Sequence, residues 1–154
     1  MPRSTLLLLT ALLLAGCRFA AAPEAEPVPE AVSIGWEVTA EAPGTYDEPR
    51  FSLALALTGG TEQALDLGTY SGSFADGRES PVVAVDDALL TGASWWAGAG
   101  DEFYVLQAAA GGLEVYHRVV EEEVEPGEFT LLGTIQVPSG ADIEVAPLAE
   151  ATNP

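Results

Sequence analysis

The side chains able to do chemistry in this 154-residue sequence are few in kind. There is one cysteine, Cys17, and one histidine, His117, against 24 aspartate and glutamate residues. One cysteine and one histidine do not supply the ligand set of a tetrahedral zinc site. A Ser–His–Asp arrangement would need His117 as its base, but the residues around His117 place it on the apolar face of a strand, where a structural role is expected. No catalytic residue is therefore assigned, and carboxylates are the only abundant groups for acid–base catalysis.

Aromatic residues form the first candidate ligand-binding site, which consists of Trp95, Trp96, Tyr104 and Tyr116. Adjacent residues on a strand point to opposite faces, so we expect one tryptophan in the core and its neighbour at the surface. An exposed indole could stack on a sugar ring or anchor a protein partner. The alternative is that both tryptophans pack, one in each layer.

Loop carboxylates form the second candidate site. Asp76, Asp86 and Asp87 are the expected metal ligands, and further glutamates follow at residues 121–125. Calcium takes about six to eight oxygen ligands, which clustered loop carboxylates can supply. The spacing does not match an EF-hand loop, and a solvated acidic turn is the alternative. Calcium is the one cofactor considered, and otherwise none is expected.

The charge of the chain is strongly one-sided. Its formal net charge is −19, and it contains no lysine. Such a chain repels nucleic acids and anionic lipid headgroups. We therefore exclude nucleic acid as a partner, along with membrane binding through a basic surface.

Period-two alternation predicts the elements that must position these residues. It is clearest in residues 32–40, where Val32, Ile34, Trp36 and Val38 share a face. The other predicted strands cover residues 51–58, 63–70, 82–85, 103–107, 113–120, 129–137 and 143–145. Gly59-Gly60 and the segment 109–112 are the expected hairpin turns, and residues 71–81 are an expected loop. A helix over residues 101–111 is the alternative to the strand at 103–107.

These short strands predict an all-β domain, either a single antiparallel β-sandwich or a small β-barrel. No amphipathic helix is convincing, and the short connections favour hairpins. The faces that carry large apolar residues are expected to meet in one core. In the strand at 129–137, this inward face would carry Phe129, Leu131, Gly133, Ile135 and Val137.

The amino-terminal residues carry the most specific motif in the chain. The apolar run from Leu6 to Leu14 is shorter than the about 20 residues that a membrane-spanning helix needs, and it suits a secretory signal peptide. It ends in Leu14-Ala15-Gly16-Cys17, which resembles the lipobox of bacterial lipoproteins. The resemblance implies cleavage before Cys17 and attachment of lipid to its sulfur, which would remove the only thiol. An A-x-A site at residues 20–22 is the alternative and would release a soluble protein.

The chain therefore divides into four predicted parts: a signal peptide (1–16), a lipidated cysteine with a Pro/Glu-rich tether (17–31), a β domain (32–146) and a frayed tail (147–154). Proline and like charges extend the tether, which gives a reach of roughly 40 Å. Arg18, rather than aspartate, follows the cysteine, and by the same resemblance this favours the outer membrane or cell surface over retention at the inner membrane. The periplasm is the alternative location.

The expected function is that of a membrane-anchored envelope lipoprotein whose domain binds a protein or a glycan without catalysis. A carboxylate-dependent hydrolase and a structural accessory of an envelope assembly are the alternatives. A pocket holding two carboxylates would favour the hydrolase.

Overall fold

The computed structural model describes residues 31–60, 62–77 and 85–148, and its regular structure is almost entirely β. A short 3-10 turn, η1 (Thr45–Asp47), lies between the first two strands. The strands are β1 (Val32–Ala40), β2 (Arg50–Thr58), β3 (Gln63–Ser71), β4 (Ser73–Asp76), β5 (Leu90–Trp96), β6 (Ala99–Gln107), β7 (Gly112–Glu121), β8 (Thr130–Gln136) and β9 (Ile143–Val145).

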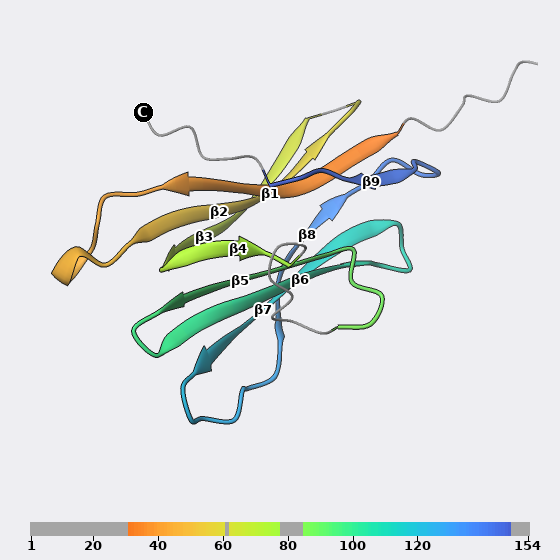
Figure 1. Ribbon diagram of the computed structural model, residues 1–154. Helices are drawn as coiled ribbons and strands as arrows, with labels where there is room; N and C mark the ends of the chain where they lie inside the picture. Colours follow the sequence, from red (N-terminus) through yellow and green to blue (C-terminus); the bar gives the residue numbers. More distant parts are fainter. Residues whose placement is uncertain (1–30, 61, 78–84, 149–154) are drawn as a thin grey trace, which may run out of the picture.

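The strands form two sheets that pack face to face (Figure 1). One sheet has the order β3-β2-β1-β9, and the other has the order β4-β5-β6-β7-β8. All neighbours are antiparallel except β1 and β9, which pair in parallel, contrary to the expectation of purely antiparallel sheets. Because the two sheets are separate, the fold is the predicted β-sandwich and not the barrel alternative.

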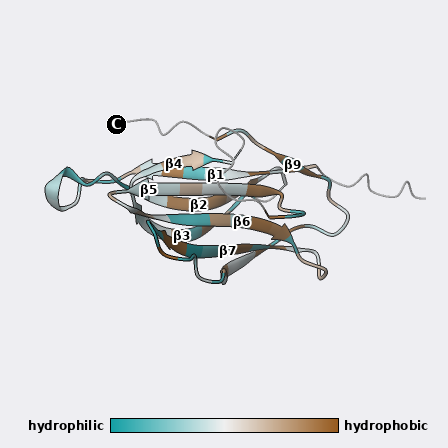
Figure 2. Ribbon diagram, turned by 60° about the horizontal axis from the view of Figure 1, so that its bottom comes forward, coloured by the Kyte–Doolittle hydropathy of each residue, from teal (hydrophilic) through white to brown (hydrophobic). Residues whose placement is uncertain are grey.

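Alternation along the strands builds the core, as the sequence predicts. Val32, Ile34 and Trp36 of β1 are buried. The four large apolar residues of β2 are buried too, namely Phe51, Leu53, Leu55 and Leu57. In Figure 2 the apolar stretches, shown in brown, lie within the strands. Both predicted hairpin turns are present: Gly59 and Gly60 follow β2, and Gly111 precedes β7, all with positive φ.

Aromatic rings join the two sheets across this core. Trp36 of β1 meets Phe74 of β4 and Phe103 of β6 in edge-on contacts, with ring centroids 5.8 and 6.3 Å apart. Its indole N–H donates to the carbonyl of Thr91 at 3.0 Å, so the polar atom of this buried side chain is paired. Edge-on aromatic pairs add about 0.5–1.5 kcal/mol beyond the area they bury.

One prediction about the middle of the chain is wrong, because the expected loop at residues 71–81 contains strand β4. The segment from Leu89 to Gly100, for which the sequence predicted no element, contains strand β5 and the start of β6. Strand β6 itself confirms the strand, rather than the helix, expected at residues 103–107. The predicted strand at 82–85 falls mostly on residues 82–84, which lie outside the described residues, and Val85 is not in a strand.

Bulges explain where the alternation fails. In β3, the register shifts opposite Leu53 and Ala54. Gly68 adopts φ +106°, and its N–H donates to the Asp66 carboxylate at 2.9 Å. In β8, the register with β7 shifts between the partners of Val115 and Tyr116. The extra residue turns Leu131 outward, so its predicted inward position is wrong.

Both ends of the chain extend beyond the described part. Leu148, assigned from sequence to the tail, packs against the core, whereas residues 149–154 are outside the description. The leader, Cys17 and the tether to residue 30 also lie outside it. Among the described residues, the structure has no helix that is long and apolar enough to span a membrane.

Candidate functional site

The β5–β6 hairpin places Trp95 and Trp96 at one end of the sandwich. Ala97 and Gly98 form its tight turn, with φ of +48° and +87°. In the ladder, Trp95 pairs with Gly100 and Trp96 with Ala99, so the two indoles belong to opposite faces of the five-stranded sheet. Both are exposed, at 49% and 40%, so the expectation that one lies in the core is wrong. The hairpin end extends past the packed centre, and Trp36 occupies the core instead.

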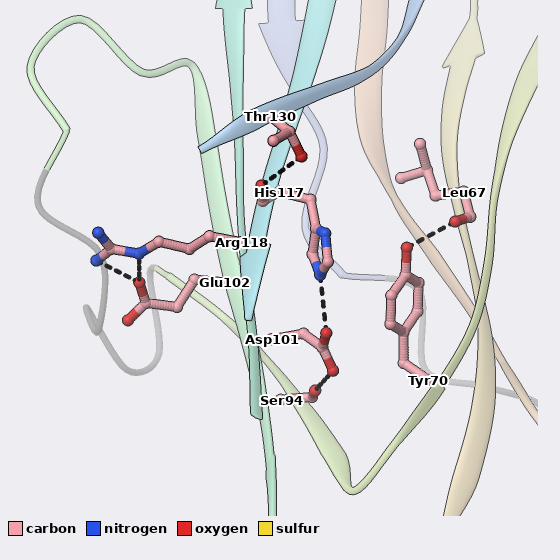
Figure 3. Close-up of polar contacts among 8 residues, drawn as sticks. All are labelled: Leu67, Tyr70, Ser94, Asp101, Glu102, His117, Arg118 and Thr130. Atoms are coloured by element: carbon pink, nitrogen blue, oxygen red, sulfur yellow. Dashed lines mark hydrogen bonds and ion pairs between the residues drawn. The ribbon is translucent and has the colours of Figure 1, made fainter. Parts of the chain in front are cut away.

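Strands β6 and β7 repeat this division of neighbours between two faces. Asp101 and Glu102 are consecutive on β6, and His117 and Arg118 are consecutive on β7. Asp101 pairs with His117 on the face toward the other sheet, whereas Glu102 pairs with Arg118 on the outward face. Figure 3 shows the two pairs on either side of the strand ribbons.

The inner pair belongs to a hydrogen-bonded cluster between the sheets. His117 Nε2 lies 2.8 Å from Asp101 Oδ1, and the Ser94 hydroxyl donates to Asp101 Oδ2 at 3.3 Å. A carboxylate only accepts hydrogen bonds, so His117 donates from Nε2. Its ring packs on Phe103 and Tyr70, with centroids 5.0 and 5.6 Å apart. The prediction that His117 lies on the apolar face is confirmed.

Tyr70 of β3 closes this cluster from the other sheet. Its hydroxyl donates to the carbonyl of Leu67 at 2.7 Å (Figure 3). Burial, together with the negative charges of Asp101 and Asp66, raises the pKa of Tyr70 to about 12. The hydroxyl therefore stays protonated at neutral pH and acts as a hydrogen-bond donor.

A hollow of about 360 Å³ opens beside this cluster at the mouth between the two sheets; we call it the inner hollow. Trp96 and Val119 line its apolar part, and both come from the inward face of the five-stranded sheet. Glu48, Tyr70 and Asp101 are its polar residues, and the lining is completed by Thr69, Ser71, Ala99 and Gly100. The Thr69 hydroxyl itself lies on the other face of β3, 3.3 Å from that of Ser52. Its volume falls within the range of about 300–1,000 Å³ that is typical of small-molecule sites.

A smaller hollow of about 210 Å³, the outer hollow, lies on the opposite face of the same sheet. Trp95 and Glu102 line it together with small or apolar side chains, namely Ser73, Ala75, Ala93 and Val120. Gly100 faces Trp95 across the ladder, and a Cβ there would come within 2.7 Å of the indole. The absence of a side chain at Gly100 thus lets the indole lie close to the strand.

Arg118 ties the carboxylate of the outer hollow to the sheet surface. Its Nε and Nη2 both lie 2.6 Å from Glu102 Oε2. The guanidinium carbon also lies 4.3 Å from the centre of the Phe129 ring. The Glu102 charge is therefore compensated before any ligand arrives.

Tyr104 and Tyr116 stack on each other and not on either tryptophan. Their rings lie 4.8 Å apart at an angle of 13°, and Phe129 packs edge-on against Tyr104 at 4.6 Å. The Tyr116 hydroxyl donates to Glu114 at 2.8 Å, and this bond raises the pKa of Tyr116. The structure thus does not bring the four predicted aromatic residues together as one site.

The predicted metal ligands are also dispersed over different elements. Asp76 is buried at the end of β4, whereas Asp86 and Asp87 lie in the turn before β5. Across residues 31–60, 62–77 and 85–148, no three His, Cys, Asp or Glu side chains gather as a candidate metal site.

The arrangement of the inner cluster differs from that of a Ser–His–Asp triad. In a Ser–His–Asp triad the serine bonds to the histidine, but Ser94 and His117 both bond to Asp101 here. The effect is to fix the Asp101 carboxylate at the edge of the inner hollow. The sequence did not indicate Glu48, Tyr70, Asp101 or Arg118 as site residues. For Asp101 and Arg118 a signal was present, because polar or aromatic neighbours at 95–96, 101–102 and 117–118 place functional side chains on both faces of a strand.

Comparisons with known proteins add no relative to this description. No family model, curated protein or solved structure matches the chain. The functional argument therefore depends on the chemistry of the two hollows.

Proposed function

We propose that the protein is a lipid-anchored protein of the bacterial envelope whose β-sandwich binds glycans, without catalysis, through the inner hollow. The anchoring part depends on the resemblance of Leu14-Ala15-Gly16-Cys17 to a lipobox. It places the domain on a tether at the outer membrane or cell surface. Mass spectrometry of the mature amino terminus tests this part, since a Cys17→Ser variant should remain uncleaved and carry no lipid.

The observation that carries the glycan proposal is the lining of the inner hollow. Trp96 offers a partly exposed flat indole, and the polar residues Glu48, Tyr70 and Asp101 line the same space. A sugar ring presents a C–H face that stacks on an aromatic ring, and hydroxyl groups that need hydrogen-bond partners. The two carboxylates, Glu48 and Asp101, favour neutral or amino sugars and oppose sugars that carry acidic groups.

The outer hollow supplies a matched control within the same hairpin. It also contains one tryptophan and one carboxylate, but its volume is smaller and its other lining residues are mainly alanine and valine. Glu102 is moreover neutralised by Arg118. We therefore expect sugar binding on the Trp96 side and not on the Trp95 side.

Calorimetric titration with neutral, amino and acidic trisaccharides tests the proposal. Trp96→Ala should weaken binding of the neutral or amino sugars about tenfold or more, since loss of an aromatic contact at a binding centre costs at least about 1.4 kcal/mol. Trp95→Ala should change the affinity less than about twofold. Equal losses in the two variants, or no binding by any trisaccharide at millimolar concentration, would refute glycan binding at the inner hollow.

One observation favours a second candidate, the carboxylate-dependent hydrolase. Glu48 and Asp101 line the same hollow, and most glycosidases use a pair of carboxyl groups. A reducing-end assay on bound oligosaccharides separates the two functions. Turnover that Asp101→Asn and Glu48→Gln each abolish would establish the hydrolase, whereas binding without turnover supports the binding module.

A further inference from the structure

The β1–β2 connection contains an exposed aromatic residue that contributes nothing to the core. Tyr46, in η1, is 94% exposed. The loop that carries it projects beyond the strand ends at one end of the sandwich in both views (Figure 1 and Figure 2). A single exposed aromatic residue is normal at a protein surface, so a role for Tyr46 has to be argued from the conformation and position of its loop.

The loop nevertheless has a defined conformation. The N–H of Glu41 donates to the carbonyl of Arg50 at 2.9 Å, and the N–H of Gly44 donates to the carbonyl of Glu48 at 2.8 Å. These bonds close the loop at its base and near its tip. Tyr46 is therefore presented by a hydrogen-bonded turn.

That turn holds its tip in a strained backbone conformation. Tyr46 has φ 62° and ψ 36°, and Asp47 has φ 57°, so two consecutive non-glycine residues lie in the left-handed region. This region is unfavourable for bulky side chains by about 1–2 kcal/mol per residue. Burial of Tyr46 does not offset the strain, because the side chain is in solvent. Strain of this kind is concentrated at ligand-binding sites.

The same loop lines the inner hollow through Glu48. Consecutive Cα atoms are about 3.8 Å apart, so the Tyr46 Cα lies within about 8 Å of the Glu48 Cα. Tyr46 thus belongs to the loop that supplies part of the rim of the inner hollow, but it is not one of the residues that line it. A single sugar in the hollow would leave Tyr46 unused, whereas a longer chain would extend past it.

We propose that Tyr46 is a second aromatic contact for the ligand, and that the ligand is therefore an oligosaccharide and not a single sugar. This inference depends on the proposed glycan binding at the inner hollow. One sugar unit stacks on Trp96, and a neighbouring unit stacks on the Tyr46 ring. The strained turn holds that ring in place before binding, which reduces the entropy lost on association.

Titration of the Tyr46 variants with a monosaccharide and a trisaccharide of the same sugar tests the inference. Tyr46→Ala should weaken trisaccharide binding about five- to tenfold and monosaccharide binding less than about twofold. Tyr46→Phe should retain the affinity, because stacking needs the ring. Val124→Ala, which alters another exposed loop residue, should leave both affinities unchanged.

The strain supplies an independent readout. Tyr46→Gly should raise the melting temperature while weakening trisaccharide binding, because glycine adopts positive φ readily. If Trp96→Ala abolishes binding but Tyr46→Ala leaves trisaccharide affinity intact, the inference about Tyr46 is overturned and the glycan site remains. If neither variant changes the binding of any sugar, the glycan site itself is wrong and the inference falls with it.

Discussion

The two faces of the sheet formed by β5, β6 and β7 contain similar residues in different surroundings. Each face has one tryptophan at the hairpin end and one carboxylate paired with a cationic or imidazole side chain: Trp96, Asp101 and His117 inward; Trp95, Glu102 and Arg118 outward. Inward, a second sheet supplies Tyr70 and the loop residue Glu48. Outward, no described element packs above the pair as a second layer. The opposing sheet, more than the residue types, therefore distinguishes the inner hollow, which we propose as the binding site, from the outer hollow.

The largest expected effect is a difference in the free energy of unfolding between variants of the Asp101–His117 pair and of the Glu102–Arg118 pair. His117→Ala removes a ring packed between Phe103 and Tyr70, as well as a partner of Asp101, so we expect a loss of about 2–3 kcal/mol in the free energy of unfolding. Arg118→Ala lets water reach Glu102 on the open face, so its loss should be about 1 kcal/mol. Urea denaturation of both variants measures the difference.

The conservative variant Arg118→Lys serves as control for the outer face. It keeps a positive charge beside Glu102 but not the planar stack on Phe129. Its free energy of unfolding should therefore lie between those of Arg118→Ala and the native protein. A loss for Arg118→Ala equal to that for His117→Ala would contradict the idea that the inner face is the more constrained of the two.

Sequence patterns predicted most of the fold because most strands carry large apolar residues at period two. This holds for β1 and β2, whose alternating residues are buried as expected. Strand β5 was missed because Gly92, Ala93 and Ser94 are too small to show a hydrophobic period, although all three pair with residues of β6 in the ladder. Strand β4 was missed because it has four residues and only Phe74 is large.

The candidate site was less predictable, because it depends on register and on contacts between distant segments. Asp101 meets His117 only because β6 and β7 pair in one particular register. Glu48 reaches the inner hollow from a loop that lies more than fifty residues before Asp101 in the chain. The sequence did indicate Trp95 and Trp96 as candidate ligand contacts and correctly placed them on opposite faces, but it could not show that the hairpin end lies outside the core.

The next effect in size is alkaline destabilisation, which should arise mainly on the inner face. The folded state raises the pKa of Tyr70 to about 12 from its ordinary value of 10.0. The stability from protonated Tyr70 is therefore complete below about pH 10 and is lost as the pH rises through about 12. We expect a loss of about 1 kcal/mol across this window, since partial exposure to solvent reduces the full effect of the shift.

Tyrosine-to-phenylalanine variants test this assignment. Tyr70→Phe should remove the alkaline slope of the unfolding free energy, because it removes the titrating hydroxyl. Tyr116→Phe should leave most of the slope in place, because the bond to Glu114 that raises the Tyr116 pKa lies at the exposed surface, where solvent screening weakens its effect on stability. A slope that persists in Tyr70→Phe would mean that another group dominates the alkaline transition.

The smallest effect compares the two exposed indoles directly. Variants that keep a single tryptophan report on each site by acrylamide quenching of its fluorescence. With Trp95 or Trp96 alone, the emission should be readily quenched, slightly more for Trp95, whereas Trp36 alone should be shielded. Addition of the trisaccharide should then protect Trp96 and leave Trp95 unchanged, because only the inner hollow combines an indole with hydrogen-bonding side chains from both sheets. Equal protection of the two indoles would show that the hairpin tip as a whole is covered, and it would favour a protein partner across both faces over a sugar in one hollow.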